Sequence, residues 1–264
     1  MKYIDTHCHL NLDDYDSDRK EVIDRARKSE VGMIVVGTNL ETSKKAVKIA
    51  EENDDIWAII GLHPTEIICE IADGLFNSDA YMELAVHNKV VGIGECGFDY
   101  FRNKASAESQ REIFEKQISI ANEVSKPLML HMRCSMDRKQ NAYEDTLEVL
   151  KKHVKVPGNA HFFAGNWEEG REFLNMDFRL SFNGVITFTH DYDEVVRNTP
   201  LNMILSETDA PYIIPNPQRV AGTFKRNEPL YVIEVANAIA NIRNHDREIV
   251  LSHLVDNARK LFKL

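Results

Sequence analysis

Eight short apolar segments, separated by stretches with helical periodicity, constrain the fold of this chain more than any other feature of its sequence. Several of the segments are continuously apolar rather than alternating, which is typical of parallel strands covered on both faces. Each intervening stretch is long enough for about one helix. The predicted strands lie near residues 3–6, 33–37, 56–60, 90–94, 127–131, 159–163, 179–183 and 203–207.

Eight strand–helix units within 264 residues predict a TIM (β/α)8 barrel, with residues 1–264 as a single domain. The clearest helical pattern follows Ser106 and places one apolar stripe on Ile113, Phe114, Gln117, Ile118, Ala121 and Val124. A doubly wound open sheet is the alternative fold. That fold usually carries a glycine-rich phosphate loop after its first strand, and the sequence DTHCHL at 5–10 is not such a loop.

Charge and hydropathy exclude several classes of protein. With 32 Lys and Arg against 42 Asp and Glu, the formal net charge is -10, so a protein that coats nucleic acid non-specifically is excluded and any such contact must be local. No apolar run approaches the ~18 residues of a transmembrane helix. The first residues lack the apolar core of a secretory signal. We therefore expect a cytoplasmic protein with no membrane partner and, since no interface pattern is visible, a monomer.

The positions of the histidines indicate a functional site. Of ten histidines, five lie at or just past the end of a predicted strand, namely His7, His9, His63, His131 and His161. A single histidine in such a place is more often a hydrogen-bonded core residue than a ligand. Because all strands of a barrel end at the same mouth, five of them predict a cluster there.

Two carboxylates complete the predicted cluster. Glu95 is expected to end the fourth strand, and Asp209 follows the eighth. Imidazole and carboxylate ligands together suit zinc, manganese, iron or nickel. Six protein ligands exceed the need of one catalytic ion, so we predict two divalent ions bridged by Glu95. One ion is assigned to His7, His9, Glu95 and Asp209, and the other to Glu95, His131 and His161.

Other acidic residues near these positions have simpler interpretations. Glu207 lies two residues before Asp209, and we expect it to support the site from behind the ligands. Asp13, Asp14, Asp16 and Asp18 resemble a metal-binding run, but they precede a predicted helix. We interpret them as N-caps and as favourable charge in the first helical turn.

Eight short motifs distributed along the chain carry a resemblance to a known family. They are DTHCHL at 5–10, GLHP at 61–64, GECGFDY at 94–100, H-x-R at 131–133, HFFAG at 161–165, SETDAPY at 206–212, RNEP at 226–229 and N-x-x-K-L-F at 257–262. Together they resemble the TatD-type metal-dependent deoxyribonucleases of the amidohydrolase superfamily of barrels. The match extends over nearly the whole chain.

The resemblance implies a metal-dependent deoxyribonuclease that digests DNA from its 3′ end. It also implies that the six residues assigned above are the metal ligands, that His63 contacts substrate or handles a proton, and that Arg226 and Asn227 hold a phosphate. Magnesium, manganese and zinc are the candidate ions.

For the mechanism, we expect Asp209 to accept a proton from an attacking water held with Glu95 between the two ions. Arg133 would bind a flanking phosphate. Tyr100 would stack on an end nucleotide, with packing of its loop as the alternative. The acidic surface favours single-stranded or frayed DNA ends over long duplex contacts.

Two other functions remain open at this point. The same site could hydrolyse an amide or ester, for example as a D-aminoacyl-tRNA deacylase. Many amidohydrolases carry a carboxylated lysine as the bridging ligand, and Glu95 at this position favours the nuclease. The second alternative is a non-catalytic metal-binding module, against which the complete ligand set argues.

Overall fold

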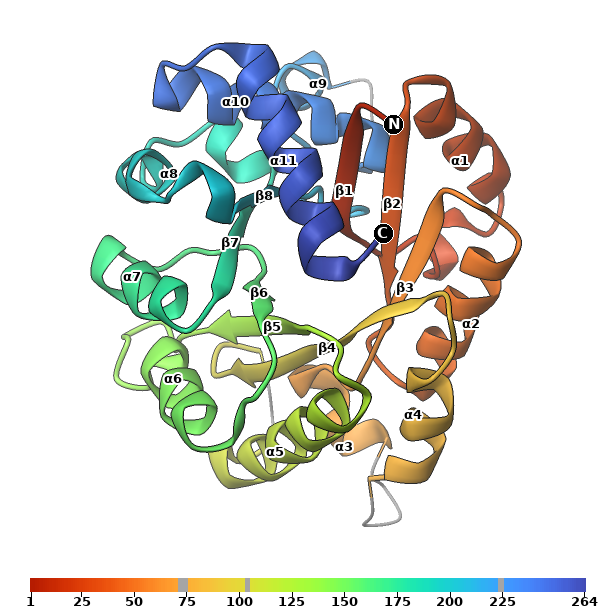
Figure 1. The fold of residues 1–264 in the computed structure, drawn as a ribbon, viewed down its shortest axis with the longest axis vertical. Helices are drawn as coiled ribbons and strands as arrows, with labels where there is room; N and C mark the ends of the chain where they lie inside the picture. Colours follow the sequence, from red (N-terminus) through yellow and green to blue (C-terminus); the bar gives the residue numbers. More distant parts are fainter. Residues whose placement is uncertain (71–75, 103–104, 223–225) are drawn as a thin grey trace.

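The structure is an eight-stranded parallel barrel in which the strands follow one another in sequence order (Figure 1). It is a computed structural model that describes residues 1–70, 76–102, 105–222 and 226–264. The strands are β1 Tyr3–Cys8, β2 Val31–Val36, β3 Ile56–Ile60, β4 Val90–Asp99, β5 Leu128–Arg133, β6 Gly158–Ala160, β7 Phe178–Phe182 and β8 Ile204–Ser206. All eight predicted strands are confirmed.

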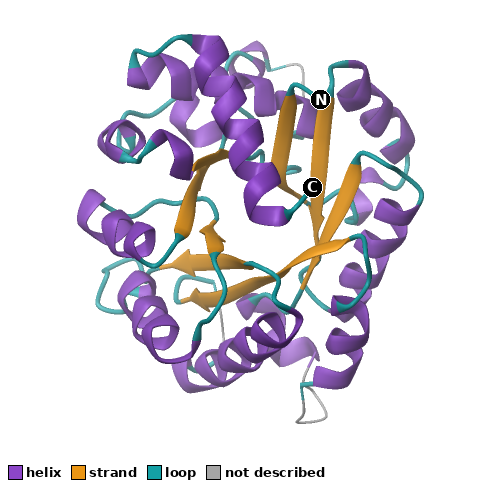
Figure 2. Cartoon of the chain, viewed as in Figure 1, coloured by secondary structure: helices purple, strands orange, loops and turns teal. Residues whose placement is uncertain are grey.

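Helices surround the strands on the outside of the barrel (Figure 2). They are α1 Arg19–Lys28, α2 Leu40–Glu51, α3 Ile67–Glu70, α4 Ser78–Ala85, α5 Ala107–Val124, α6 Ala142–His153, α7 Trp167–Asn175, α8 Asp193–Asn198, α9 Gln218–Ala221, α10 Val232–Arg243 and α11 Arg247–Phe262. Within the described part of the chain, no helix combines the length and the apolar character needed to cross a membrane.

The barrel closes between its last and first strands through a few backbone contacts rather than a regular ladder. The amide of Asp209 donates to the carbonyl oxygen of His7 at 2.9 Å, and the amide of His9 donates to that of Ala210 at 2.7 Å. Cys8 and Ala210 also form an isolated parallel bridge. The sheet is therefore a nearly closed barrel, which confirms the predicted fold class and excludes the open-sheet alternative.

Helix α5 forms where its sequence pattern predicts it. The side chain of Ser106 accepts a hydrogen bond from the amide of Ser109 at 3.1 Å and caps the helix N-terminus. The predicted apolar stripe is buried from Ile113 to Ala121. Gln117 belongs to this buried face, and its amide group bonds both backbone groups of Leu62, the residue before His63.

The inside of the barrel is apolar where α11 closes it. Side chains of several strands pack there against the last turns of α11. The residues in contact are Ile4, Ile34, Ile59, Val91, Met129 and Leu205 from the strands and Val255, Leu261 and Phe262 from the helix. Helix α11 also lies beside Met1, Lys2 and Tyr3, which mark the N-terminal end of β1. This closure leaves the opposite end, where the strands terminate, for polar side chains.

The N-cap interpretation of the acidic run is wrong for Asp18. Asp18 occupies the N-cap position of α1, but its side chain makes no capping hydrogen bond. Its carboxylate instead accepts hydrogen bonds from the guanidinium of Arg226. A charge-assisted bond of this kind is stronger than a bond to a neutral backbone amide, and so the long-range pair replaces the local cap.

We predict that Gln117→Leu lowers the free energy of unfolding by roughly 2–4 kcal/mol, because the buried amide and carbonyl of Leu62 lose their partners. Urea denaturation measures the change. The control is Ser119→Leu on the exposed face of the same helix, which should change the free energy by less than about 0.5 kcal/mol. Equal effects of the two substitutions would contradict the proposed role of Gln117.

Candidate metal centre

The six predicted ligand residues meet at the mouth of the barrel. They come from five different strands or the residues that follow them. His7 lies in β1 and His9 directly after it, Glu95 in β4, His131 in β5, His161 directly after β6 and Asp209 after β8. The barrel thus brings together side chains separated by as many as 202 positions, the distance in sequence from His7 to Asp209.

The sequence predicts that Glu95 ends the fourth strand, and this prediction is wrong. Strand β4 continues past Glu95 to Asp99. The pairing of β4 with β5 shifts its register between Gly94 and Cys96. Gly94 and Gly97 have φ values of 144° and 136°, and a Cβ at either position would collide with the carbonyl oxygen of Met129 or of His131. These glycines let β4 lie close against β5 while Glu95 points into the mouth.

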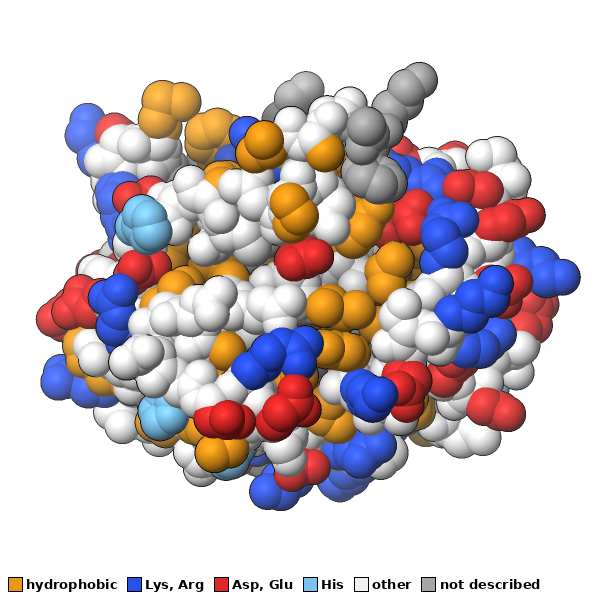
Figure 3. Space-filling view, turned by 90° about the horizontal axis from the view of Figure 1, so that it is seen from above, with side chains coloured by type: hydrophobic (Ala, Val, Ile, Leu, Met, Phe, Trp, Pro, Cys, Tyr) orange, Lys and Arg blue, Asp and Glu red, His pale blue; other side chains and the backbone are white. Residues whose placement is uncertain are grey.

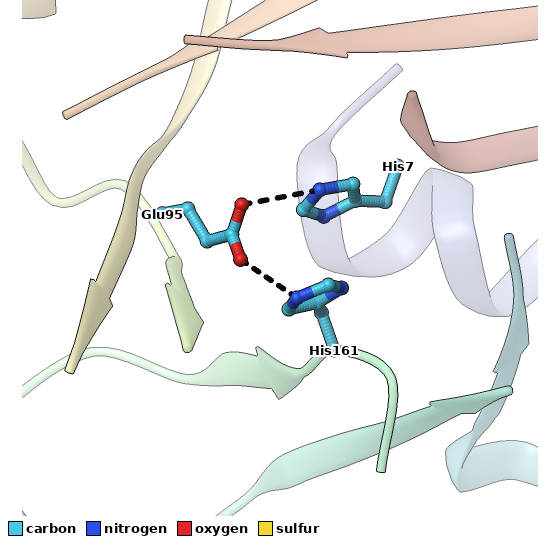
Figure 4. A group of neighbouring side chains, drawn as sticks. All are labelled: His7, Glu95 and His161. Carbon is cyan, nitrogen blue, oxygen red and sulfur yellow. Dashed lines mark ion pairs between the residues drawn. The ribbon is translucent and has the colours of Figure 1, made fainter. Parts of the chain in front are cut away.

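The two carboxylate oxygens of Glu95 face two different groups of histidines. Oε2 lies 3.3 Å from Nε2 of His7 and 3.8 Å from Nε2 of His9. Oε1 lies 2.8 Å from Nδ1 of His131 and 2.8 Å from Nε2 of His161. Figure 4 shows the carboxylate between His7 and His161. One carboxylate is therefore shared between two sets of nitrogen donors.

Asp209 joins the first of these two groups. Its Oδ1 lies 3.5 Å from Nε2 of His9 and 3.8 Å from Nε2 of His7. Within the described residues, three sets of donor atoms lie within 4.8 Å of one another, namely His7, His9 and Asp209, then His7, Glu95 and His161, then His63, Glu95 and His131. Donor atoms this close, all nitrogen or carboxylate oxygen, could hold metal cations.

The electrostatic environment keeps both carboxylates ionised. Burial alone would raise the pKa of Glu95, but the neighbouring histidines, and His161 most strongly, bring it well below its ordinary value. Burial likewise opposes ionisation of Asp209, and a hydrogen bond with His9 lowers its pKa overall. Burial lowers the pKa of His63 to about 3, with a contribution from the adjacent His131. His63 is therefore neutral at ordinary pH.

A buried carboxylate supports His161 from behind. Glu207 Oε1 accepts hydrogen bonds from Nδ1 of His161 at 3.1 Å and from the amide of Phe162 at 2.8 Å. Its Oε2 accepts from the hydroxyl of Ser181 at 2.5 Å. Because Nδ1 is occupied, Nε2 of His161 is left to face Glu95, and the interpretation of Glu207 as a supporting residue is confirmed.

Asp99 is a site residue that the sequence analysis missed. Its Oδ2 lies 3.0 Å from Nε2 of His131, on the side of the ring opposite to Glu95. Its Oδ1 accepts from the amides of Phe101 and Arg102. The signal that points to Asp99 is its spacing, since residues four apart in a strand share a face and Glu95 already marks that face.

Asp5 was also missed, although it lies in the first motif. Its Oδ1 accepts from the amides of Thr208 and His7, and its Oδ2 accepts from the hydroxyl of Thr208. Asp5 thereby ties β1 to the segment that carries Asp209. Its alternation with His7 and His9 along β1 is the sequence signal for this position.

A cavity of about 790 Å³ opens above the cluster. His63 and Arg133 line it together with His9, Glu95, His131, His161 and Asp209, while His7 lies beneath them. His63 Nε2 is 3.5 Å from Oε1 of Glu95. Arg133 projects its guanidinium over the ring of Phe101, 4.3 Å from the ring centroid.

The other three predicted substrate contacts lie outside the lining of this cavity. The hydroxyl of Tyr100 donates to Asp145 at 2.5 Å. The guanidinium of Arg226 binds Asp18 and lies 4.2 Å from the ring centroid of Tyr15. The buried amide of Asn227 donates to the carbonyl oxygens of Thr208, Tyr212 and Ile213. These internal contacts hold the loops around the mouth, and contact of the three residues with substrate stays a prediction.

Comparison with known proteins gives concordant matches along the chain. The family model described as "TatD related DNase" matches residues 4–263. An uncharacterized metal-dependent hydrolase, YabD, of Bacillus subtilis is 40% identical, with 98% of each chain covered. A protein of Pantoea ananatis named 3′-5′ ssDNA/RNA exonuclease TatD is 34% identical over 98% of this chain and 99% of its own.

Solved structures agree with these matches. The crystal structure of YJJV, a TatD homolog from Escherichia coli, superposes with a TM-score of 0.86 at 25% identity and covers 100% of this chain and 98% of its own. A hydrolase from Entamoeba histolytica has the same fold, with a TM-score of 0.84 at 22% identity over 98% and 97% of the two chains.

We predict that Glu207→Ala lowers the free energy of unfolding by roughly 2–4 kcal/mol, because the amide of Phe162 and the hydroxyl of Ser181 lose their acceptor. Glu207→Gln retains an acceptor for Phe162 and should cost about 1 kcal/mol or less. Urea denaturation distinguishes the two, with Glu123→Ala on the exposed face of α5 as the control. If Glu207→Ala lowers the free energy of unfolding no more than Glu123→Ala does, the supporting role of Glu207 is disproved.

Proposed function

The chain belongs to the TatD related DNase family and is a metal-dependent hydrolase, and on this premise we propose that it cleaves DNA phosphodiester bonds as a 3′-5′ exonuclease. The observation that carries the proposal is the shared carboxylate of Glu95, with one oxygen toward His7 and His9 and the other toward His131 and His161. A site that shares a carboxylate in this way suits two ions, which is a common arrangement in nucleases and phosphatases. Relatives named as 3′-5′ ssDNA/RNA exonucleases support the choice of substrate.

We propose that this donor set holds two divalent ions. His7, His9 and Asp209 with Oε2 of Glu95 would hold one ion, and His131 and His161 with Oε1 of Glu95 would hold the other. Nitrogen donors favour manganese or zinc over magnesium in such a site. When bound, the ions supply an acidified water and positive charge that stabilises the phosphoryl oxygens during cleavage.

Asp209 is the residue best placed to accept the proton of the attacking water. Its carboxylate is ionised and borders the cavity beside His9. Its backbone is fixed on both sides, because its amide donates to the carbonyl oxygen of His7 and its carbonyl oxygen accepts from Tyr212. A fixed, ionised carboxylate meets the requirement for a general base.

His63 is better suited to bind the scissile phosphate than to protonate the leaving oxygen. Its Nδ1 accepts a hydrogen bond from the amide of Thr65 at 3.0 Å, so the single proton of the neutral ring resides on Nε2. Nε2 lies on the cavity side, toward Glu95. A neutral N–H there can donate a hydrogen bond to a phosphate oxygen, whereas it is a poor source of a proton.

Arg133 would bind the phosphate next to the cleaved bond. It lines the cavity and stacks on Phe101. Among the ion pairs of the described residues, none involves Arg133, so its charge is free to pair with a ligand. In a chain with a net charge of -10, this local positive charge suits a single-stranded end rather than a long duplex.

The experiment that tests the proposal is digestion of 5′-labelled DNA. Metal-stripped protein is resupplied separately with magnesium, manganese or zinc and given single-stranded DNA, duplex DNA or RNA. We expect stepwise shortening of single-stranded DNA from its 3′ end, and we expect Asp209→Ala to lower the rate at least ~100-fold because the general base is lost. Asp256→Ala, an exposed acid on α11, is the matched control.

Absence of cleavage with every metal, at verified metal content, would refute the nuclease. The next substrate to test would then be the ester bond of an aminoacyl-tRNA, which requires the same activated water.

The number of ions is tested separately by metal analysis of the purified protein. We expect about two equivalents per chain in the wild type and one or fewer in Glu95→Gln, because an amide does not bridge two cations as a carboxylate does. Glu123→Gln on the surface of α5 should retain both. Two equivalents in Glu95→Gln would show that Glu95 does not bridge.

A further inference from the structure

An aromatic and cationic pair lies at the rim of the barrel, beyond the cavity. Phe188 follows the 3-10 turn Gly184–Thr187 after β7, and its side chain is 39% exposed. The guanidinium carbon of Arg219, in α9, lies 4.4 Å from the centroid of the Phe188 ring. Among the described residues, no carboxylate lies within ion-pair distance of Arg219. The pair therefore presents a partly exposed ring and an uncompensated positive charge.

This pair is connected to the metal centre through packed backbone. Tyr212 lines the cavity, is 51% exposed and lies edge-on to His9, with ring centroids 6.2 Å apart. The segment that follows Tyr212 packs along the turn before Phe188, because the amide of Asn216 donates to the hydroxyl of Thr187 at 2.8 Å. Tyr212, which lines the cavity, and Phe188, which does not, thus lie on adjoining segments that follow the ends of β8 and β7.

The chemistry of this rim matches a single nucleic acid strand. Bases stack on aromatic rings with little regard for sequence, and arginine pairs with the phosphates between them. A partly exposed ring beside an arginine offers a platform on which a base can stack, and the face of the molecule drawn in Figure 3 carries interspersed acidic and basic side chains rather than a wide basic surface. A narrow track of this kind fits a flexible strand better than a duplex.

We propose that Tyr212, Phe188 and Arg219 form a track for the nucleotides that precede the cleaved 3′ end. The proposal rests on the proposed nuclease function and adds the route of the strand. Tyr212 stacks a base close to the metal centre, and Phe188 with Arg219 holds the next base and phosphate at the rim. The track extends the site to several nucleotides and gives long single strands an advantage over very short ones.

The test measures binding of metal-loaded protein to fluorescent single-stranded oligonucleotides of 2 and 12 nucleotides. Their linkages are phosphorothioates, which resist cleavage during the measurement. We expect Phe188→Ala to weaken binding of the 12-mer about 5- to 100-fold, as loss of one stacking platform implies, and to leave the dinucleotide, which is too short to reach Phe188, unchanged. Phe188→Tyr should restore binding. Arg219→Ala should reduce the salt dependence of 12-mer binding by about one phosphate contact.

Val220→Ala provides the matched control, since Val220 is 80% exposed on α9 beside Arg219 and carries no ring or charge. Equal affinity of the wild type for both lengths, or an equal loss at both lengths in Phe188→Ala, would overturn the track. Hydrolysis of bis(p-nitrophenyl) phosphate by the wild type tests the nuclease chemistry independently. A protein that cleaves this diester but shows no effect of Phe188 on the 12-mer would retain the proposed function and lose the track.

Discussion

The rest of the site depends on a single carboxylate buried among imidazole rings. Glu95 is 3% exposed, and an isolated charge at such a depth would cost several kcal/mol. The surrounding histidines compensate by lowering its pKa, with His131 and His161 each 2.8 Å from Oε1. The carboxylate therefore remains charged at the point where two sets of donors meet. Two of these histidines are in turn directed by a second carboxylate, since Glu207 bonds His161 and Asp99 bonds His131.

Such a cluster requires a scaffold that holds many strands in place at once. The barrel provides this because its stabilising apolar packing and its polar site lie at opposite ends. Its interior is apolar where α11 packs against the strands, so burial of these apolar side chains stabilises the barrel at the end opposite to the mouth. Buried side-chain amides then hold the backbone beside the site in place through hydrogen bonds. Gln117 holds Leu62 beside His63, and Asn227 holds the backbone on both sides of Asp209. The polar end can thus carry many charged groups without weakening the core.

The sequence was sufficient to predict the strands and the six converging donors, because both follow from local patterns and from the common direction of barrel strands. It was not sufficient where a contact joins distant segments. Asp18 was expected to cap its own helix, but it pairs with Arg226, 208 positions away. The course of β4 past Glu95 was missed for a different reason. It depends on how closely Gly94 and Gly97 let one strand approach its neighbour, and a glycine in the sequence does not reveal that distance.

Whether the arginines around the mouth are paired with carboxylates bears on which substrate the protein accepts. Arg226 is bound to Asp18, so its charge is compensated within the protein. Arg133 and Arg219 instead lie over Phe101 and Phe188, and stacking on a ring leaves the full positive charge available. In an acidic chain, these two arginines, one at the end of β5 and one in α9, provide local positive charge that attracts phosphate. A duplex needs a broad basic surface, whereas a strand end needs only a few fixed charges and a ring on which its bases can stack.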